Sequence, residues 1–310
     1  MKALVVTNMW PTADRPAYGI FVADQVAALR RSGADVDVFH FDGGSPFAYL
    51  KAALRLRKEN RTEYDVVHAH FGLSAWVARA ARAKVRAVTF HGTDLAHPRS
   101  RRISLAALRF IDLPAAASAE LAAQVPKTNL KNPIQVLPCG VALDRFETAD
   151  KMVARTELGL SANDLVVLLP SDPSRPEKRS DRARQVADAL GAKLITLGGV
   201  PPELVPVRIN ASDLVLIPSE REGFGLALLE SLACETPVLT TPNGVAAEAV
   251  EGVAGAESLA WDESKWAEAG KRLASLGATS GGRASASRWS SDACAEAVIA
   301  AWSGALSDRG

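Results

Sequence analysis

Cysteine is scarce in this chain of 310 residues, and that scarcity excludes a small domain stabilised by disulfides or by zinc. The three cysteines, Cys139, Cys234 and Cys294, are too few and too widely spaced for a disulfide framework or a zinc site. Their odd number and wide spacing suit a reducing compartment. We therefore expect a cytoplasmic protein.

Long apolar runs are also missing. No segment approaches the roughly 18 uninterrupted apolar residues that a membrane-spanning helix needs. The N-terminus is apolar, but Asn8 and Trp10-Pro11 interrupt it early, and it lacks the small-residue cleavage site of a signal peptide. This segment is typical of a buried first strand.

The chain has no excess of either charge. Its 36 basic and 35 acidic residues give a net charge of +1, which excludes a protein that coats nucleic acid by bulk positive charge. Apolar residues make up 48% and charged residues 23%, which excludes dominant disorder and allows sizeable cores. The near-neutral total conceals an asymmetry, because residues 1–150 carry 20 basic and 14 acidic side chains and residues 151–310 carry 16 and 21.

Short apolar runs alternate with helical patterns along the chain, which indicates parallel strands covered on both faces. The predicted strands are 3–7, 36–41, 66–70, 87–90, 165–169, 193–197, 213–218 and 237–241. The predicted helices are 20–31, 49–59, 73–84, 226–233 and 292–306, with a loop over 273–291. The pattern predicts a doubly wound α/β fold.

The two α/β series predict two domains with a cleft between them. We expect an N-terminal domain over 1–148 and a second domain over 149–290. The last segment, 291–310, is predicted to be a helix that could pack back on the first domain.

The most informative stretch is 218–238. Gly223 and Gly225 follow a predicted strand, where the backbone can approach a ligand closely, and the next helix offers unpaired N–H groups to a phosphate. Glu222 and Glu230 lie eight residues apart, and their carboxylates could accept hydrogen bonds from sugar hydroxyls. A plain strand–turn–helix with two solvated glutamates is the alternative interpretation.

A basic loop follows the first predicted strand of the second half. Arg175 and Lys178 would lie at a strand end that faces the same crevice. A guanidinium and an ammonium there could hold a diphosphate and stabilise it as it leaves. A solvated basic loop is the alternative.

Taken together, these segments resemble the retaining GT-B glycosyltransferases of family GT4. The matching segments follow the family order from residue 1 to about 252, and they comprise 10–33, Asp65-Val-Val-His68-Ala-His70, Phe90-His91-Gly-Thr-Asp94, Leu137–Phe146, Arg175–Arg179, Asn210–Asp213, Glu222–Glu230 and Asn243–Glu248. The resemblance implies two facing Rossmann-like domains, an acceptor-side domain over 1–148 and a nucleotide-sugar-binding domain over 149–290. It also implies retaining transfer of a sugar from a nucleotide-sugar donor, which is a substrate, with no essential metal or other cofactor.

The resemblance implies catalytic roles for four side chains. Arg175 and Lys178 would stabilise the leaving nucleoside diphosphate, and Glu222 would bind hydroxyls of the transferred sugar. His91, at the end of a predicted strand, would face the sugar near the reacting carbon. In this family the leaving phosphate is usually described as helping to deprotonate the acceptor, so positioning and electrostatic stabilisation would supply most of the rate.

The resemblance also implies a set of donor-binding residues. Glu230 would bind the donor ribose, and Gly19 would let the N-terminal loop approach the phosphates. Backbone amides would hold the sugar and the phosphates at four consecutive residues, Gly223, Phe224, Gly225 and Leu226.

The sequence departs from the family pattern in four places. Ser171-Asp172 stands where Gly-Arg is usual, so Arg175 is matched through an Arg-x-x-Lys variant. Glu235 replaces a glycine before Thr-Pro, which could perturb the turn, and Ala142 replaces an acidic residue. Only fifteen residues separate the predicted strands 193–197 and 213–218, so we expect a shortened second domain and leave the nucleotide base open.

Other interpretations of the motifs stay open. A GT-B sugar-nucleotide epimerase or hydrolase, or a catalytically silent sugar-nucleotide-binding protein, would share the same motifs. Asp35-Val-Asp37 matches a metal-binding D-x-D pattern, but a polar edge strand explains it more simply. His68 and His70 lie on one strand face as a candidate metal pair, for which packing in the cleft or the core is the favoured alternative.

Basic residues cluster in the first half of the chain. A solvated helical face is the common explanation, and docking on an anionic membrane or acceptor is the functional alternative. The acceptor could then be anionic or lipid-linked, and the protein peripheral at the inner membrane face; we expect no nucleic-acid partner. The positions are Lys51, Arg55, Arg57, Lys58, Arg61, Arg79, Arg82, Lys84, Arg86, Arg99, Arg101 and Arg102.

Overall fold

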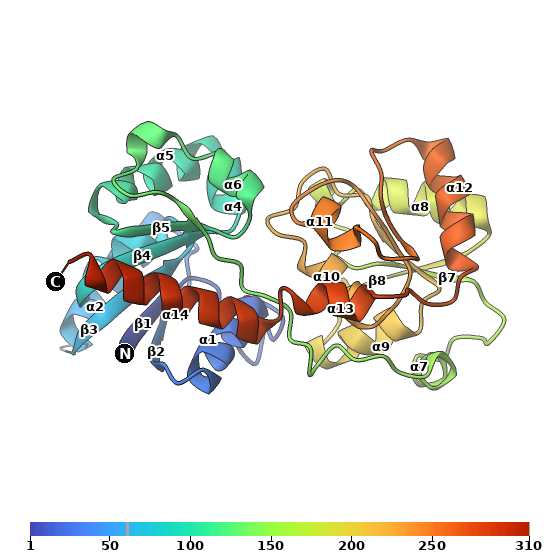
Figure 1. Cartoon of the computed structure of the whole chain (residues 1–310), viewed down its shortest axis with the longest axis horizontal. Helices are drawn as coiled ribbons and strands as arrows, with labels where there is room; N and C mark the ends of the chain where they lie inside the picture. Colours follow the sequence, from blue (N-terminus) through green and yellow to red (C-terminus); the bar gives the residue numbers. More distant parts are fainter. Residues whose placement is uncertain (60–61, 310) are drawn as a thin grey trace. The chain divides into compact units, whose positions relative to one another are not determined.

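The computed structural model describes residues 1–59 and 62–309. The chain forms two compact units, Met1–Gly140 with Ser291–Gly310, and Val141–Ser290 (Figure 1). The first unit therefore ends eight residues before the predicted boundary and includes the C-terminal helix. The predicted cleft between the domains stays a prediction.

The first unit contains a six-stranded parallel sheet in the order β2-β1-β3-β4-β5-β6. Its strands are β1 (Lys2–Thr7), β2 (Asp35–His40), β3 (Glu63–His70), β4 (Arg82–Phe90), β5 (Leu113–Ala116) and β6 (Gln135–Val136). Its helices are α1 (Ile20–Arg31), α2 (Pro46–Glu59), α3 (Ser74–Ala78), α4 (Thr93–Ala96), α5 (Pro98–Ala107), α6 (Ala119–Ala123) and α14 (Ser291–Ser307), with 3-10 turns at Leu108–Phe110 and Lys127–Asn129. The chain order reverses between β1 and β3, and ligands bind beyond the carboxyl ends of strands at such a switch point.

The second unit contains a five-stranded parallel sheet in the order β11-β10-β9-β7-β8. Its strands are β7 (Val166–Leu169), β8 (Lys193–Thr196), β9 (Leu214–Ile217), β10 (Val238–Thr240) and β11 (Ala256–Ser258). Its helices are α7 (Lys151–Glu157), α8 (Ser180–Leu190), α9 (Val205–Asn210), α10 (Leu226–Ala233), α11 (Ala246–Val250), α12 (Glu263–Ala274) and α13 (Gly282–Ser287), with 3-10 turns at Pro176–Lys178 and Pro202–Leu204. The switch point here lies between β7 and β9. These two sheets confirm the predicted α/β class with two Rossmann-like domains.

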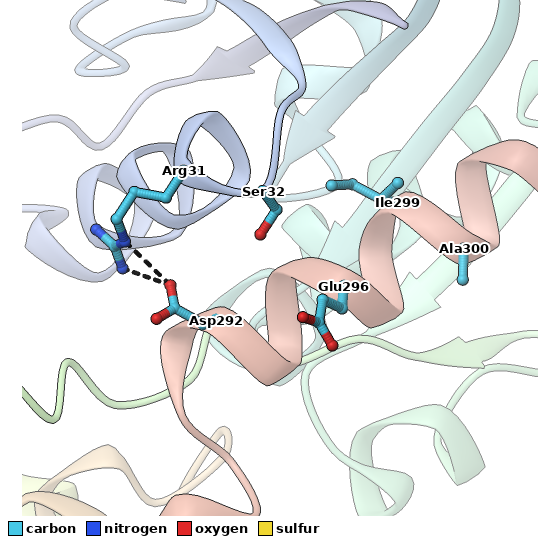
Figure 2. A pocket seen from close by; sticks show the side chains of 6 residues that line it. All are labelled: Arg31, Ser32, Asp292, Glu296, Ile299 and Ala300. Carbon is cyan, nitrogen blue, oxygen red and sulfur yellow. Dashed lines mark hydrogen bonds and ion pairs between the residues drawn. The ribbon is translucent and has the colours of Figure 1, made fainter.

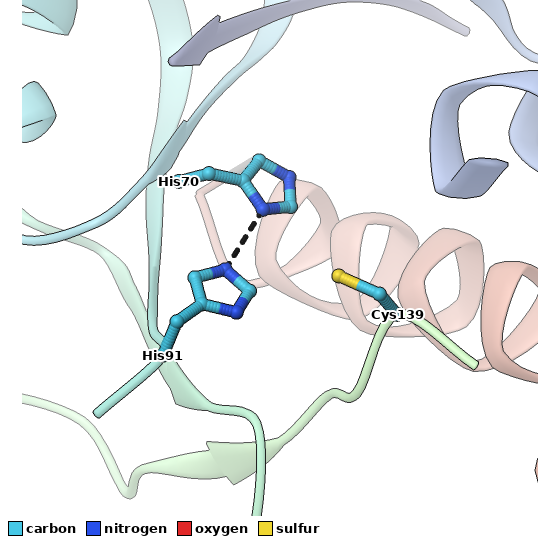
Figure 3. A group of neighbouring side chains, drawn as sticks. All are labelled: His70, His91 and Cys139. Atoms are coloured by element: carbon cyan, nitrogen blue, oxygen red, sulfur yellow. Dashed lines mark hydrogen bonds between the residues drawn. The ribbon is translucent and has the colours of Figure 1, made fainter. Parts of the chain in front are cut away.

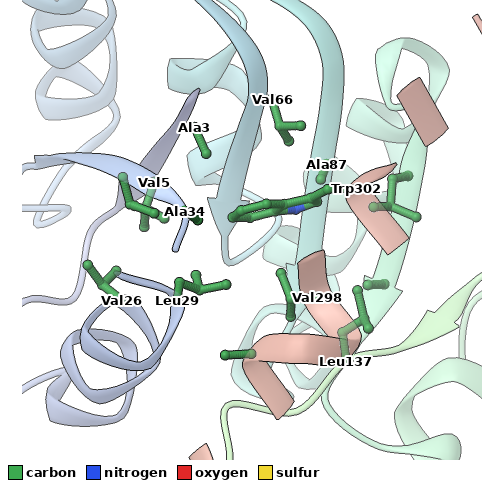
Figure 4. Close-up of a cluster of buried hydrophobic side chains, with 14 of the residues drawn as sticks. Ala3, Val5, Val26, Leu29, Ala34, Val66, Ala87, Leu137, Val298 and Trp302 are labelled. Carbon is green, nitrogen blue, oxygen red and sulfur yellow. The ribbon is translucent and has the colours of Figure 1, made fainter. Parts of the chain in front are cut away.

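The C-terminal helix completes the core of the first unit. Trp302 and Val298 on α14 are fully buried against the sheet and against α1, beside residues such as Val66 and Leu29 (Figure 4). Val298 and Trp302 are four residues apart and therefore share one helix face. Burial of that face explains why the end of the chain folds with its beginning.

Two predicted elements were wrong. The helix predicted over 73–84 ends at Ala78, and β4 already begins at Arg82, because Arg82 and Lys84 face solvent while Val85 and Ala87 are buried with the alternation of a strand. The predicted loop over 273–291 contains α13, whose small residues pack closely on α10. Glycine and alanine in that stretch therefore permit close helix packing as well as a loop.

The turn at Glu235 keeps a left-handed backbone although the residue is not glycine. Its φ is +55°, and its carbonyl accepts a hydrogen bond from the Thr279 N–H at 2.8 Å. The glutamate therefore adopts the conformation that glycine would adopt more easily.

Within the described residues, no helix combines the length and the apolar character needed to cross a bilayer.

Candidate active site

Lys178 and Glu222 meet at the switch point of the second sheet. Lys178 ends the 3-10 turn after β7, and Glu222 lies in the loop after β9. The Lys178 Nζ donates to both carboxylate oxygens of Glu222 at 2.8 Å, and the two side chains are only 13% and 12% exposed. The two loops are also joined by the Glu220 N–H, which donates to the Glu177 carbonyl at 2.9 Å. The geometry thus presents an ammonium beside a carboxylate where an open α/β sheet binds ligands.

Arg175 does not join that pair. Its guanidinium is half-exposed and binds the Glu177 carboxylate at 2.7 Å within the same loop. Arg182, which sequence reasoning missed, is closer to the loop after β9, because it donates to the Pro218 carbonyl at 3.2 Å and lies over the Trp261 ring at 5.0 Å. Its position four residues after Lys178, in the first turn of α8, could have marked Arg182 as a site residue in the sequence.

The loop from Gly223 to Leu226 is held against the next strand connection. Gly225 has a φ of +110° and caps α10, which Leu226 begins. The Phe224 carbonyl accepts a hydrogen bond from the Val245 N–H at 2.8 Å, and a Cβ added to Gly244 would lie 2.2 Å from that oxygen. The backbone of this loop is therefore fixed in place before any ligand arrives.

Glu230 lies on α10, in the second turn of the helix that this loop begins. It is partly buried. Burial, and then the charge of Glu230, raise the pKa of Cys234 to about 12. Cys234 is consequently an inert thiol, and Glu230 is the charged residue of this helix.

His91 and His70 form a pair at the carboxyl edge of the first sheet (Figure 3). The His70 Nδ1 and the His91 Nε2 lie 2.9 Å apart, and their rings stack with centroids separated by 5.1 Å. Phe21 and Phe71 flank the His91 ring at 5.2 and 4.8 Å. Burial first, and then His68, lower the pKa of His91 to about 3, so its imidazole is neutral near pH 7.

His68 belongs to the core rather than to a metal site. The Trp302 Nε1–H donates to its Nδ1 at 3.2 Å, which leaves the proton on Nε2, bonded to the Thr89 hydroxyl at 2.8 Å. Burial lowers the pKa of His68 to about 4. This arrangement agrees with the packing interpretation for His68.

Two residues shape the loops around this histidine pair. Asp94 accepts hydrogen bonds from the N–H groups of Gly92 at 2.9 Å and Gly72 at 3.0 Å, which orders the turn after His91. Gly19 has a φ of +76°, and an added Cβ would lie 2.4 Å from the Met9 carbonyl carbon. Only glycine therefore lets the loop before α1 return to the end of β1.

Several of the other charged candidates have structural partners. Asp37 accepts a hydrogen bond from the Tyr64 hydroxyl at 2.9 Å and lies 4.0 Å from the Lys2 Nζ, as Asp35 does, which agrees with a polar edge strand. Lys84 binds Asp65 at 2.8 Å. Arg82, Lys84 and Arg86 stand on β4, not on a helical face, and Arg61 lies outside the described residues.

A pocket of about 540 Å³ lies between α1 and α14 (Figure 2). The Arg31 guanidinium and the Asp292 carboxylate, 2.6 Å apart, line one side of it. It contains none of the residues that the sequence singled out, and it lies away from the carboxyl edge of the sheet. We assign it no role in catalysis.

Two family models match separate parts of the chain. Residues 176–276 match the glycosyl transferases group 1, and residues 43–145 match glycosyltransferase family 4. Lys178, Glu222 and Glu230 fall within the first match, and His70 and His91 fall within the second.

Curated relatives agree with these models. The D-inositol 3-phosphate glycosyltransferase of Geodermatophilus obscurus is 32% identical in an alignment 266 residues long, gaps included. The alignment covers 67% of this chain and 59% of that protein. The enzyme of the same name from Actinosynnema mirum is 29% identical in an alignment 355 residues long, gaps included, which covers 85% of each chain. The chain thus spans less than two thirds of the first relative and most of the second.

Solved structures show the same fold. Sucrose-phosphate synthase from Thermosynechococcus elongatus has a TM-score of 0.77 at 20% identity, with 99% of each chain covered. The Anabaena protein HepE, solved with UDP and glucose, has a TM-score of 0.72 at 18% identity, with 98% of this chain and 100% of that chain covered. Both units therefore have the architecture of GT-B enzymes, as the sequence predicted. The protein is a member of glycosyltransferase family 4, the group 1 glycosyltransferases of the GT-B fold.

Proposed function

We propose that this chain transfers a sugar, with retention of configuration, from a nucleoside diphosphate sugar to an anionic acceptor. The observation that carries the donor half of the proposal is the partly desolvated Lys178–Glu222 pair at the switch point of the second sheet. A diphosphate would take the ammonium of Lys178, and the released carboxylate of Glu222 would accept hydrogen bonds from sugar hydroxyls. Family membership supports the same roles.

The chemistry then follows from charge. The bond between the anomeric carbon and the leaving phosphate oxygen breaks, and negative charge develops on the diphosphate beside Lys178. The acceptor oxygen attacks the same face, and its proton passes to the leaving phosphate. Glu222, which is paired with Lys178 before the donor binds, acts in binding rather than as a nucleophile. No metal is proposed as an essential part of this step.

The proposed acceptor is a phosphorylated polyol. Residues 1–150 carry the basic excess of the chain, and the curated relatives bear the name D-inositol 3-phosphate glycosyltransferase. The free state of all three cysteines supports a cytoplasmic setting for such an enzyme.

We expect full-length protein, given UDP-, GDP- or ADP-sugars, to glycosylate D-inositol 3-phosphate at least ten times faster than unphosphorylated inositol. Proton NMR of the product would show the anomeric configuration of the donor. An inverted product would overturn retention, and equal rates with both acceptors would overturn the anionic acceptor. Free sugar or an epimerised donor as the only product would overturn transfer and favour a hydrolase or an epimerase.

A second interaction is favoured by α2, for which we propose contact with an anionic bilayer. Phe47, Leu50 and Leu54 share one face and are 81%, 59% and 60% exposed, while Leu56 on the opposite face is buried. Exposed lysines and arginines flank the apolar side chains at Lys51, Arg57 and Lys58. An apolar stripe bordered by cations fits a surface of anionic lipid headgroups.

Replacing Phe47, Leu50 and Leu54 together by serine should lower binding to phosphatidylglycerol vesicles at least tenfold, because each side chain contributes about 1 kcal/mol on partial insertion. Vesicle co-sedimentation measures this. The matched control replaces the exposed Met152 and Val153 of α7 by serine and should leave binding unchanged. Wild-type binding that is equal for phosphatidylcholine and phosphatidylglycerol vesicles would contradict the proposal.

A further inference from the structure

Three potential metal ligands converge at the carboxyl edge of the first sheet. His70 ends β3, His91 follows β4, and Cys139 follows β6, 69 positions after His70 in the sequence. One ligand atom from each lies within 4.8 Å of the other two (Figure 3). The cysteines are too scattered along the chain to indicate such a group, and the parallel sheet alone assembles it.

The His70 ring has capacity for another partner. Its Nδ1 faces His91, but its Nε2 is buried and, among the described residues, has no hydrogen-bond partner. A buried polar atom without a partner is unfavourable, so the site gains from any group that satisfies it. His91 is only half-buried, which leaves a way for a small ion to enter from its side.

We propose that His70, His91 and Cys139 bind a zinc-type divalent metal ion. Two imidazoles and one thiolate form a donor set that Zn²⁺ prefers, with the fourth tetrahedral position left open. Zinc–nitrogen and zinc–sulfur distances of about 2.1 and 2.3 Å place the ligand atoms about 3.3–3.6 Å apart. The present separations bracket that range, because the His70 Nδ1 and the His91 Nε2 lie 2.9 Å apart and one ligand atom from each of the three residues lies within 4.8 Å of the other two.

Binding requires small movements and the loss of one proton. The rings separate slightly, the Cys139 side chain turns toward them, and the thiol proton leaves to solvent as the thiolate coordinates the ion. Both imidazoles coordinate the ion in their neutral form. No electron transfer is involved.

The consequence for activity rests on the proposed function. A metal ion on His91 removes the imidazole from the sugar site, so the ion inhibits transfer and is not a required cofactor. Micromolar Zn²⁺ should lower the rate of transfer at least tenfold, and a chelator should restore it. The Cys139→Ser variant should be far less sensitive.

Cobalt(II) titration of the full chain tests the site without an activity assay. Wild-type protein should bind one Co²⁺ with a thiolate-to-cobalt absorption band, which added Zn²⁺ removes. Cys139→Ser and Cys139→Ala should lose the band, whereas Cys294→Ser, which changes another buried cysteine of the same unit, should keep it. Circular dichroism confirms that each variant is folded.

Absence of the band in wild-type protein, or its persistence in both Cys139 variants, would overturn the proposed site. If no donor and acceptor pair gives transfer, the proposed function fails and the cobalt spectrum still decides the metal site. If transfer occurs and the spectrum is silent, only the metal site fails.

Discussion

Replacing Lys178 by alanine should lower kcat about 10²–10³-fold at saturating donor, because a preorganised donor to developing negative charge is lost. The effect on the acceptor KM should be small, since Lys178 lies in the second unit beside Glu222 and not on the proposed acceptor side. Steady-state kinetics with varied donor and acceptor separate the two quantities. An unchanged kcat would contradict the role of Lys178.

The same substitution also leaves a carboxylate without its partner, so stability must be measured beside activity. Lys178→Ala should lower the melting temperature, because the mostly buried Glu222 loses its cation. The double variant Lys178→Ala with Glu222→Gln should recover most of the stability and none of the kcat. Lys193→Ala, which removes an exposed lysine from β8, is the matched control and should change neither.

Replacing Trp302 by alanine should lower the free energy of unfolding of the first unit by about 3–5 kcal/mol, the range for a fully buried large aromatic residue. The change removes packing between α14, α1 and the sheet, and it also removes the hydrogen bond to His68 Nδ1. Denaturant titration followed by hydrogen exchange of β1 and β3 measures the loss in that unit.

A matched substitution in the other unit provides the control. Trp266 is equally buried, on α12 of the second unit, so Trp266→Ala should weaken protection in β7 and β9 and leave β1 and β3 unchanged. Trp302→Phe should cost less than Trp302→Ala because it retains most of the apolar volume. A loss below about 1 kcal/mol for Trp302→Ala would show that the first unit does not depend on α14.

Local patterns predicted most of the elements but failed where two periods compete. The segment 73–84 has alanines and arginines at helical spacing, and its second part also alternates with the period of a strand. Pairing of β4 with β3 decides the outcome, because it adds the segment to the sheet and buries Val85 and Ala87 in the core. The helices α1 and α10 were predicted with their observed bounds, since each has one clear apolar face.

In the candidate site too, the sequence selected the residues and the tertiary structure decided which of them meet. Sequence spacing selected Lys178 and Glu222, and the structure joins them across 44 residues. The sequence motif gave Arg175 the same role as Lys178. In the structure, however, the short loop after β7 turns Arg175 toward Glu177. A spacing motif specifies which residues belong together, but loop geometry decides which of them point inward.

By itself, the sequence determined the alternation of strands and helices, the family and the residues at the strand ends, because these depend on short-range periodicity and on motifs. Only the tertiary structure decided that Trp302 reaches His68 across 234 residues and that Cys139 lies beside His70 and His91. A parallel sheet brings the carboxyl ends of distant strands to one edge, and no local pattern encodes which side chains meet there. The sequence therefore identified the residues at the strand ends, but it did not show which of them lie next to one another.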